Sequence, residues 1–310
     1  MGAGDVEEVA QDKAVQAESR PIWRKVWEFP LVAMVVGVAL MVGAIYLAST
    51  IMQLLVLPRV EAPWDDIIGA VLIVLISGLT YKLLVTRLGR KRHDDLPFDG
   101  RMLRDTLAGF GVGGLLISIC VALAALFGAY TILGGDGFGD WPMIIFVFGL
   151  YAGFFEEVVT RGIILRWLEE FAGTWIALAL SSLFFGFMHA SNDNATFFSS
   201  LAISIEAGIL LGAAYILTRS LWLAIGIHAG WNVVQALWDI PVSGNPTEGP
   251  VAATLEGHWL LAGGGFGLEA TIFALVVATS AGIWMLWKAA KAGRIVKPMW
   301  SRKGEGITAY

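Results

Sequence analysis

The chain has 310 residues, of which 57% are apolar and only 15% are charged, and its mean hydropathy is +0.71. This composition excludes an ordinary soluble or nucleic-acid-binding domain and is typical of a polytopic helical membrane protein. The formal net charge of −5 says little about partners, because most of the charges lie in loops and tails. The single cysteine, Cys120, excludes an intramolecular disulfide and a cysteine-based structural metal site.

Long apolar runs divide the chain into eight expected membrane spans, because a helix needs about 20 mainly apolar residues to cross a bilayer. The runs lie at roughly residues 30–57, 67–85, 107–133, 142–167, 173–190, 197–218, 221–238 and 266–287. The sequence therefore predicts an all-α polytopic membrane protein with a polar segment at 1–29, an eight-helix domain at 30–290 and a basic tail at 291–310. No cleaved signal peptide is expected, so the first span should serve as its own insertion signal.

The basic residues predict the orientation of these spans. Lys and Arg precede the first span, fill the loop after the second and follow the fourth, sixth and eighth, whereas the alternate loops hold only Arg59. Because cytoplasmic loops carry the excess of Lys and Arg, eight spans with both termini in the cytoplasm account for every cluster.

A glycine-rich segment in the third span, Gly109 to Gly114, contains a GxGxxG spacing. No strand precedes it and no acidic partner follows at the distance that a dinucleotide site requires. Small residues of this kind let two membrane helices approach closely, so the segment is interpreted as a helix-packing surface.

Three polar clusters interrupt the apolar sequence of the fourth to seventh spans. They comprise two glutamates with an arginine, then a histidine, then a histidine with an asparagine, at Glu156, Glu157, Arg161, His189, His228 and Asn232. Ionisable groups at membrane depth are costly and usually face a bundle interior or a wet cavity. We expect these side chains to converge in one catalytic cavity formed by spans four to seven.

The two adjacent glutamates should differ in role. Glu157 and Arg161 are four residues apart, so they share a helix face and can form an ion pair. Glu156 points about 100° away and needs another partner. A partly desolvated carboxylate beside a like charge suits a general base for water. The alternative is that both glutamates only bond helix backbones or neutralise the arginine.

The histidines lie on separate helices and cannot form a helical HExxH pair. His189 suits the orientation of an attacking water or the ligation of a metal. His228 and Asn232, four residues apart, share one face and can donate hydrogen bonds to an oxyanion. Glu206, an isolated acid in the sixth span, is expected in the cavity wall, with a structural hydrogen bond as the alternative.

In their order on successive apolar segments, Glu-Glu-x-x-x-Arg, Phe-x-x-x-His and His-x-x-x-Asn resemble the signature of the CPBP family (CAAX protease and bacteriocin-processing, or Abi), which includes the Ras-converting CAAX prenyl endopeptidase. The similar core runs from about 142 to 238, and no signature position is missing. The resemblance implies an intramembrane endopeptidase in which Glu156 and His189 activate water and His228 and Asn232 stabilise the oxyanion. Glu157 and Arg161 would brace the site.

Two questions of chemistry and substrate stay open at this point. Glu156, His189 and His228 would also make a His₂Glu set for a divalent metal such as zinc. The expected partners are a membrane-associated peptide or protein substrate and the lipid bilayer, with no nucleic acid. The acidic N-terminal segment and the compact plan favour a prokaryotic inner-membrane protein, which would process peptides or membrane proteins rather than prenylated CAAX substrates.

Other classes of protein would use the same residues differently. A proton-coupled transporter could relay protons through the glutamates and histidines, and a membrane scaffold or immunity partner would need no catalysis.

The expected depths of the polar residues within their helices raise a separate difficulty. Counted from the expected span ends, Glu156 lies about ten residues deep and His189 about sixteen, or roughly 24 Å. Either the fifth helix is strongly tilted or re-entrant, or the boundary near Gly173 is wrong.

Overall fold

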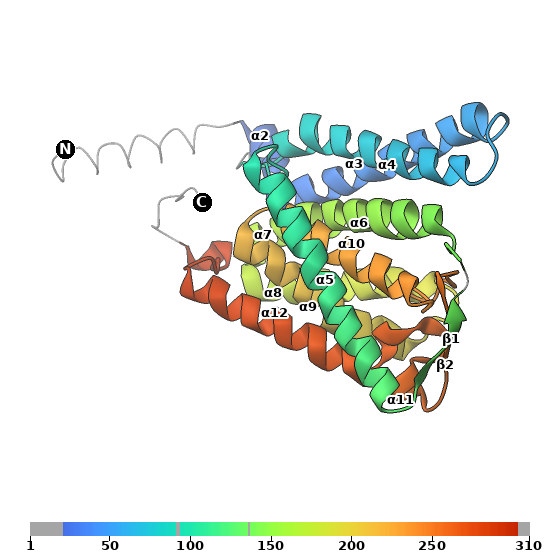
Figure 1. The fold of residues 1–310 in the computed structure, drawn as a ribbon. Coiled ribbons are helices and arrows are strands. Elements are labelled where there is room, and N and C mark those ends of the chain that lie inside the picture. Colours follow the sequence, from blue (N-terminus) through green and yellow to red (C-terminus); the bar gives the residue numbers. More distant parts are fainter. Residues whose placement is uncertain (1–20, 91–93, 136, 303–310) are drawn as a thin grey trace.

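The computed structural model describes residues 21–90, 94–135 and 137–302. Within them, seven helices are long and apolar enough to cross a membrane, which confirms the polytopic, mainly α-helical fold (Figure 1). The outer parts of the expected terminal segments, residues 1–20 and 303–310, lie outside the described residues.

The helices follow the expected spans in chain order. Among the described residues, π-helical segments occur in the first of them (η1) and in the fourth (η3 and η4), whereas η5 is a 3₁₀ turn. The first half comprises α2 (Ile22–Trp27), α3 (Pro30–Ile51) with η1 (Met52–Val56), α4 (Trp64–Leu83) and α5 (Gly100–Leu126). One long helix then runs through η3 (Met143–Ala152), α6 (Gly153–Val159), η4 (Thr160–Leu165) and α7 (Arg166–Ala172). The second half comprises α8 (Thr174–Met188) with η5 (His189–Ser191), α9 (Phe197–Thr218), α10 (Trp222–Leu237), α11 (Trp259–Ala262) and α12 (Ile272–Lys291).

Two expected boundaries are wrong by about one or two helical turns. α5 begins at Gly100 rather than near 107, because the Asp99 side chain accepts the backbone N–H of Arg101 and caps the helix. It ends at Leu126, and Gly128 follows with a positive φ of 73°. α12 begins at Ile272 rather than near 266, because Thr271 caps it and short 3₁₀ turns precede it.

The expected seventh span forms α10, a helix of 16 residues. Of these, 12 are buried in the protein. The helix falls below the length of the seven membrane-crossing helices among the described residues. Its apolar character therefore reflects burial against neighbouring helices rather than contact with lipid.

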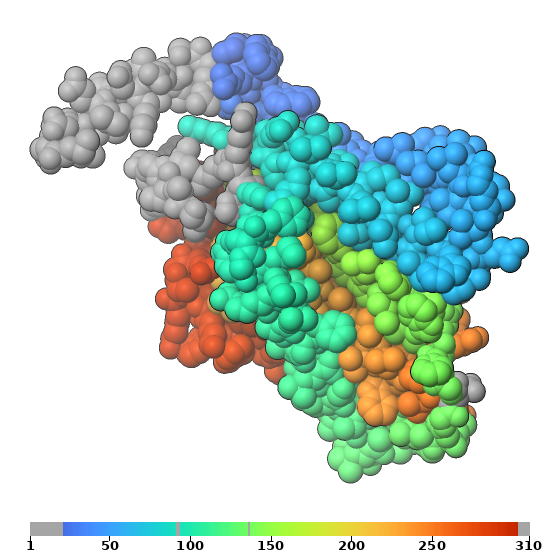
Figure 2. Space-filling view, turned by 45° about the horizontal axis from the view of Figure 1, so that its top comes forward, coloured from blue at the N-terminus to red at the C-terminus, as the bar shows by residue number. Residues whose placement is uncertain are grey.

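Close packing of α5 on α10 depends on glycine. A Cβ atom on Gly113 would lie 2.0 Å from the carbonyl oxygen of Ile227, and one on Gly109 would lie 2.5 Å from that of Leu223. The glycines of α10 reciprocate, since a Cβ on Gly230 would lie 2.2 Å from the carbonyl oxygen of Phe110. The interpretation of the glycine segment as a helix-packing surface is confirmed. Figure 2 shows α5 crossing this face of the molecule, with α10 visible between α5 and α6.

A two-stranded antiparallel sheet that the sequence did not predict closes one end of the bundle (Figure 1). β1 (Tyr130–Gly135) pairs with β2 (Val251–Leu255), which lies in the long connection after α10. The Tyr130 hydroxyl donates to the carbonyl of Trp238 at 2.9 Å, so the sheet is fixed to the end of α10.

The opposite end is joined by a buried polar network around Asp95. Its carboxylate accepts hydrogen bonds from the hydroxyls of Tyr81 at 3.0 Å and Tyr215 at 3.2 Å and pairs with Arg166 at 3.2 Å. Its carbonyl accepts the backbone N–H of Leu221 at 2.8 Å, just before α10 begins. One aspartate thus fixes the ends of α4, α7, α9 and α10 relative to one another.

Candidate active site

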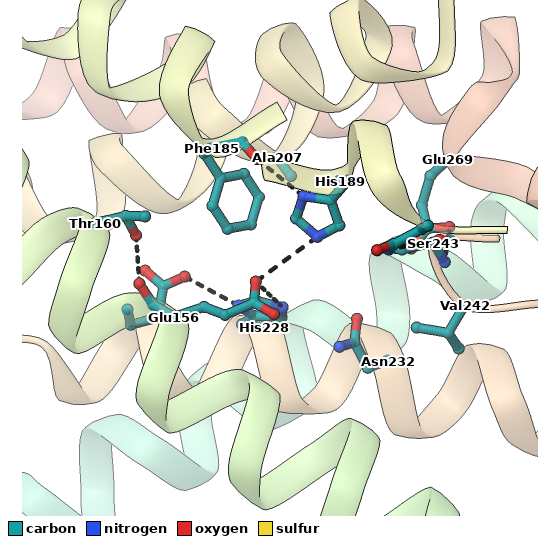
Figure 3. Close-up of polar contacts among 12 residues, drawn as sticks. Glu156, Thr160, Phe185, His189, Ala207, His228, Asn232, Val242, Ser243 and Glu269 are labelled. Atoms are coloured by element: carbon teal, nitrogen blue, oxygen red, sulfur yellow. Dashed lines mark hydrogen bonds and ion pairs between the residues drawn. The ribbon is translucent and has the colours of Figure 1, made fainter. Parts of the chain in front are cut away.

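The two adjacent glutamates lie on α6, a short α-helical segment between two π-helical ones. π-Turns shift the register of a helix and often occur at functional sites. The Thr160 hydroxyl donates to the Glu156 carbonyl at 2.5 Å, at the junction of α6 and η4 (Figure 3).

Glu157 is fully buried, and its carboxylate contacts both Arg161 and His228. Its Oε1 accepts from the guanidinium of Arg161 at 2.7 Å, which confirms the ion pair expected from their spacing. The same oxygen lies 2.9 Å from Nδ1 of His228 on α10. Arg161 also donates to the carbonyls of Ala207 and Gly208 on α9, both at 3.3 Å. These contacts join three helices around one carboxylate.

His189 is oriented by its own helix. Its Nδ1 lies 2.8 Å from the carbonyl of Phe185, one turn earlier, so in the neutral ring Nδ1 carries the hydrogen. Nε2 is then an acceptor, and it faces Glu156 (Figure 3). By the same reasoning, Nδ1 of neutral His228 donates to Glu157 and leaves its Nε2 as an acceptor.

Glu156 lies between the two histidines. Its Oε2 is 3.7 Å from Nε2 of His189 and 3.9 Å from Nε2 of His228 (Figure 3). This oxygen is buried and has no hydrogen-bond partner among the described residues. When both rings are neutral, three proton acceptors converge on one point, at distances that a single water molecule can bridge.

The aromatic ring of Phe185 explains the phenylalanine of the Phe-x-x-x-His pattern. The ring packs edge-on against His189, with centroids 5.0 Å apart, and against His228 at 5.8 Å. The guanidinium of Arg161 lies 4.4 Å from its centre on the ring face. Phe185 thus supports both imidazoles and supplies the carbonyl that orients His189.

Asn232 lies one turn after His228 on α10, and both line the same cavity. Its Nδ2 donates one hydrogen to the carbonyl of Phe148 at 3.0 Å, in the π-helical segment η3. The second amide hydrogen remains for another acceptor.

The apparent mismatch in depth between Glu156 and His189 arises because the fourth helix ends later than its expected end at residue 167. The helix that carries Glu156 continues past Trp167 to Ala172 and turns sharply at Gly173, where φ is 79°. Glu156 lies 16 residues before Ala172, and His189 lies 15 residues after Thr174. The expected start of the fifth helix near Gly173 is correct, and no re-entrant helix is needed to bring the two residues together.

A small cavity of about 30 Å³, enough for one or two water molecules, adjoins these residues. Its polar lining comes from His189, Glu206, His228, Asn232, Ser243 and Glu269. Figure 3 shows Ser243 and Glu269 on the side of His189 that faces away from Glu156. Glu206 lies in the cavity wall, as expected from the sequence, and is only 1% exposed.

Sequence reasoning missed Glu269 and Ser243. The Glu269 carboxylate accepts hydrogen bonds from the Ser243 backbone at 2.8 Å, the Ser243 hydroxyl at 3.1 Å and the Gln235 amide at 3.0 Å. Burial raises the pKa of Glu269 to about 7, and these hydrogen bonds limit the rise. An acid within the eighth expected span was an available signal for Glu269, whereas nothing local marked Ser243.

The donor atoms at Glu156, His189 and His228 are of the kinds that zinc prefers. However, no group of three or more His, Cys, Asp or Glu side chains among the described residues is placed to hold a metal ion. These three side chains have the donor types that suit zinc, but they are not placed as a three-ligand group around one ion.

Comparison with known proteins identifies the segment that contains this site. Residues 138–234 match the family model described as type II CAAX prenyl endopeptidase Rce1-like. Searches of curated proteins and of solved structures gave no match. The resemblance expected from the three polar clusters is confirmed, because residues 138–234 match an Rce1-like model that is consistent with the CPBP family.

Proposed function

We propose that the protein is an intramembrane endopeptidase that hydrolyses a peptide bond with a water molecule activated by Glu156. The observation that carries the proposal is the position of Oε2 of Glu156. This atom is buried, has no hydrogen-bond partner among the described residues and lies 3.7 and 3.9 Å from two imidazole nitrogens.

The first step is attack by water on the scissile carbonyl. A water roughly 2.8 Å from both Oε2 of Glu156 and Nε2 of His189 would hydrogen-bond to both acceptors. As its oxygen bonds to the carbonyl carbon, the water gives one proton to Glu156, and the carbonyl oxygen becomes an oxyanion.

Stabilisation of that oxyanion is assigned to His228 and Asn232. Asn232 offers the amide hydrogen that is not bonded to Phe148. His228 donates from Nε2 when its ring is doubly protonated, and the Glu157 carboxylate on Nδ1 stabilises that cation. Arg161 holds the Glu157 carboxylate in place through its hydrogen bond to Oε1.

Collapse of the intermediate completes the reaction. The carbon–nitrogen bond breaks, and Glu156 returns its proton to the leaving amine. Glu156 thus acts first as base and then as acid, while His189 orients the water. The products are a carboxylic acid and an amine, which exchange one proton to become a carboxylate and an ammonium, and the enzyme regains its starting protonation state.

We further propose that the Asp95 end of the bundle faces the cytoplasm. Arg166, Arg219 and Arg294 lie at this end, and Arg219 pairs with Glu169 and with the carbonyl of Arg294. Excess basic residues favour the cytoplasmic side of a membrane. The β1–β2 sheet then lies at the external end, in keeping with an inner-membrane protein whose termini are both cytoplasmic.

The test compares wild-type protein with Glu156→Gln, which keeps the side-chain shape but cannot accept the proton. Both are expressed in membranes, and new peptide termini in membrane proteins are identified by mass spectrometry. Termini present with wild type should disappear with Glu156→Gln and reappear with purified wild type in vesicles that contain the substrate. Glu61→Gln, which changes an exposed glutamate in the loop after η1, serves as the control and should cleave normally.

Retained cleavage by Glu156→Gln would exclude the proposed mechanism. A transporter would give a different pattern, because its Glu156→Gln variant would lose pH-dependent uptake into vesicles without any change in peptide termini. A scaffold would show neither effect.

A further inference from the structure

Glu206 is a buried carboxylate that the proposed hydrolysis does not use. The residue is 1% exposed on α9, and neither carboxylate oxygen has a hydrogen-bond partner among the described residues. A buried carboxylate without a partner costs several kcal/mol or more, so such a group is usually paired with a cation or a donor. Glu206 is therefore available to a donor that the described part of the protein does not supply.

The cavity beside Glu206 provides the space for that ligand. Glu206 lines it together with His189, His228 and Asn232, so it adjoins the point at which the scissile bond would lie. Glu269 lines the same cavity and brings a second carboxylate. The remaining wall is largely apolar and includes Ile203, Leu210 and Leu211. The site thus combines two acids with an apolar surround, directly beside the candidate catalytic residues.

We propose that Glu206, with Glu269, binds a primary ammonium group of the substrate next to the scissile bond. This inference rests on the proposed peptidase function and adds a substrate class to it. A protonated amine has three N–H donors, enough for one or both carboxylates. Its aliphatic stem would lie along the apolar wall, as lysine stems commonly do.

The chemistry of the cavity favours an ammonium group over other cations. A compact ammonium offers three N–H donors that the two separate carboxylates lining the cavity can share, whereas the planar guanidinium fork suits a single carboxylate. Metal ions need several ligands at fixed distances, and no three acidic, histidine or cysteine side chains among the described residues are placed to provide them. The ammonium can come from a lysine side chain or from a free peptide N-terminus.

Binding is tested first without catalysis. The thermal unfolding midpoint of the purified full-length protein in detergent is measured against increasing n-butylammonium chloride. Butan-1-ol supplies the same stem without charge, and tetramethylammonium supplies the charge without N–H donors. At about tenfold excess over the dissociation constant, n-butylammonium should raise the wild-type midpoint by about 3 °C, and neither comparison compound should do so.

Two matched variants assign the shift to the site. Glu206→Gln removes the charge with little change in shape and should abolish the n-butylammonium shift. Glu256→Gln removes an exposed charge from the external loop and should keep the shift. No shift with wild type, or an equal shift with Glu206→Gln, would overturn the proposal.

Cleavage assays then identify the source of the ammonium. Reporter peptides are paired so that lysine or norleucine lies beside the scissile bond, and each is made with a free or an acetylated N-terminus. Wild type should cleave at least one ammonium-containing form about tenfold faster, and Glu206→Gln should reduce that ratio to about one. Equal rates for all four peptides would contradict the proposal. If wild type cleaves no peptide, the peptidase function fails, and the n-butylammonium titration still decides the site.

Discussion

Glu157 holds His228 through a 2.9 Å hydrogen bond from Nδ1 of the imidazole to Oε1 of the carboxylate. The same oxygen accepts from Arg161 at 2.7 Å. One carboxylate therefore sets the ring orientation of a histidine on α10 while it neutralises a buried cation on its own helix. Outer partners of this kind fix which imidazole nitrogen faces a reaction.

The first prediction concerns Glu157→Gln. Removing this charge leaves the Arg161 cation, 1% exposed, without its counter-ion, and the cost should be about 3–5 kcal/mol of unfolding free energy. Cleavage should also fall about 10–100-fold, because His228 loses the carboxylate that orients it. The measurements are thermal unfolding and the cleavage rate at matched amounts of folded protein.

The double variant Glu157→Gln/Arg161→Gln separates the two effects. It removes the unpaired charge and should recover part of the lost stability, while cleavage stays low. Recovery of both properties together would show that Glu157 has only a structural role.

The second prediction concerns Asn232→Ala. If the amide stabilises the oxyanion, kcat should fall about 10²–10³-fold while KM changes little, since the interaction forms only in the transition state. Asn245→Ala is a matched control, because Asn245 also donates to a backbone carbonyl, that of Val242 at 3.1 Å. An increase in KM at constant kcat would instead assign Asn232 to ground-state binding.

The third prediction tests the α5–α10 contact. Gly113→Ala puts a methyl group 2.0 Å from the carbonyl oxygen of Ile227, so it should destabilise the protein by about 3 kcal/mol. Gly111→Ala is the natural control, because its Cβ would meet nothing within 4 Å. That variant should be neutral or slightly stabilising, because alanine favours helix. Equal thermal stability of the two variants would contradict the close packing.

The fourth prediction concerns the pH dependence of stability. The pKa of Glu269 is about 7 in the folded protein against 4.5 as its ordinary value. The folded protein therefore binds more protons than the unfolded chain between these values, so this group's contribution to stability is full below pH 4.5 and is lost as pH rises through 7. The loss amounts to about 3 kcal/mol. Glu269→Gln should flatten the decline in unfolding midpoint between pH 5 and 7.5, whereas Glu256→Gln should leave its slope unchanged.

Local sequence determined much of the framework. The lengths of the apolar segments predicted a polytopic membrane protein, and the expected span at 197–218 coincides with α9. The spacing of four residues between Glu157 and Arg161 predicted their ion pair, since it depends only on helix geometry. The glycines of α5 predicted a close helix contact for a similarly local reason, the absence of a side chain.

Only the tertiary structure decided which distant groups meet. The approach of Glu156 to His189 depends on where one helix ends at Ala172 and the next begins at Thr174, which hydropathy alone did not resolve. Pairing of β1 with β2 joins strands separated by more than a hundred residues. The meeting of Glu269 with Ser243 likewise brings an acid in the 3₁₀ turn before α12 onto a loop that carried no motif. Local periodicity fixes how each helix forms and which face it presents, whereas the packing of helices and connections determines which faces share a cavity.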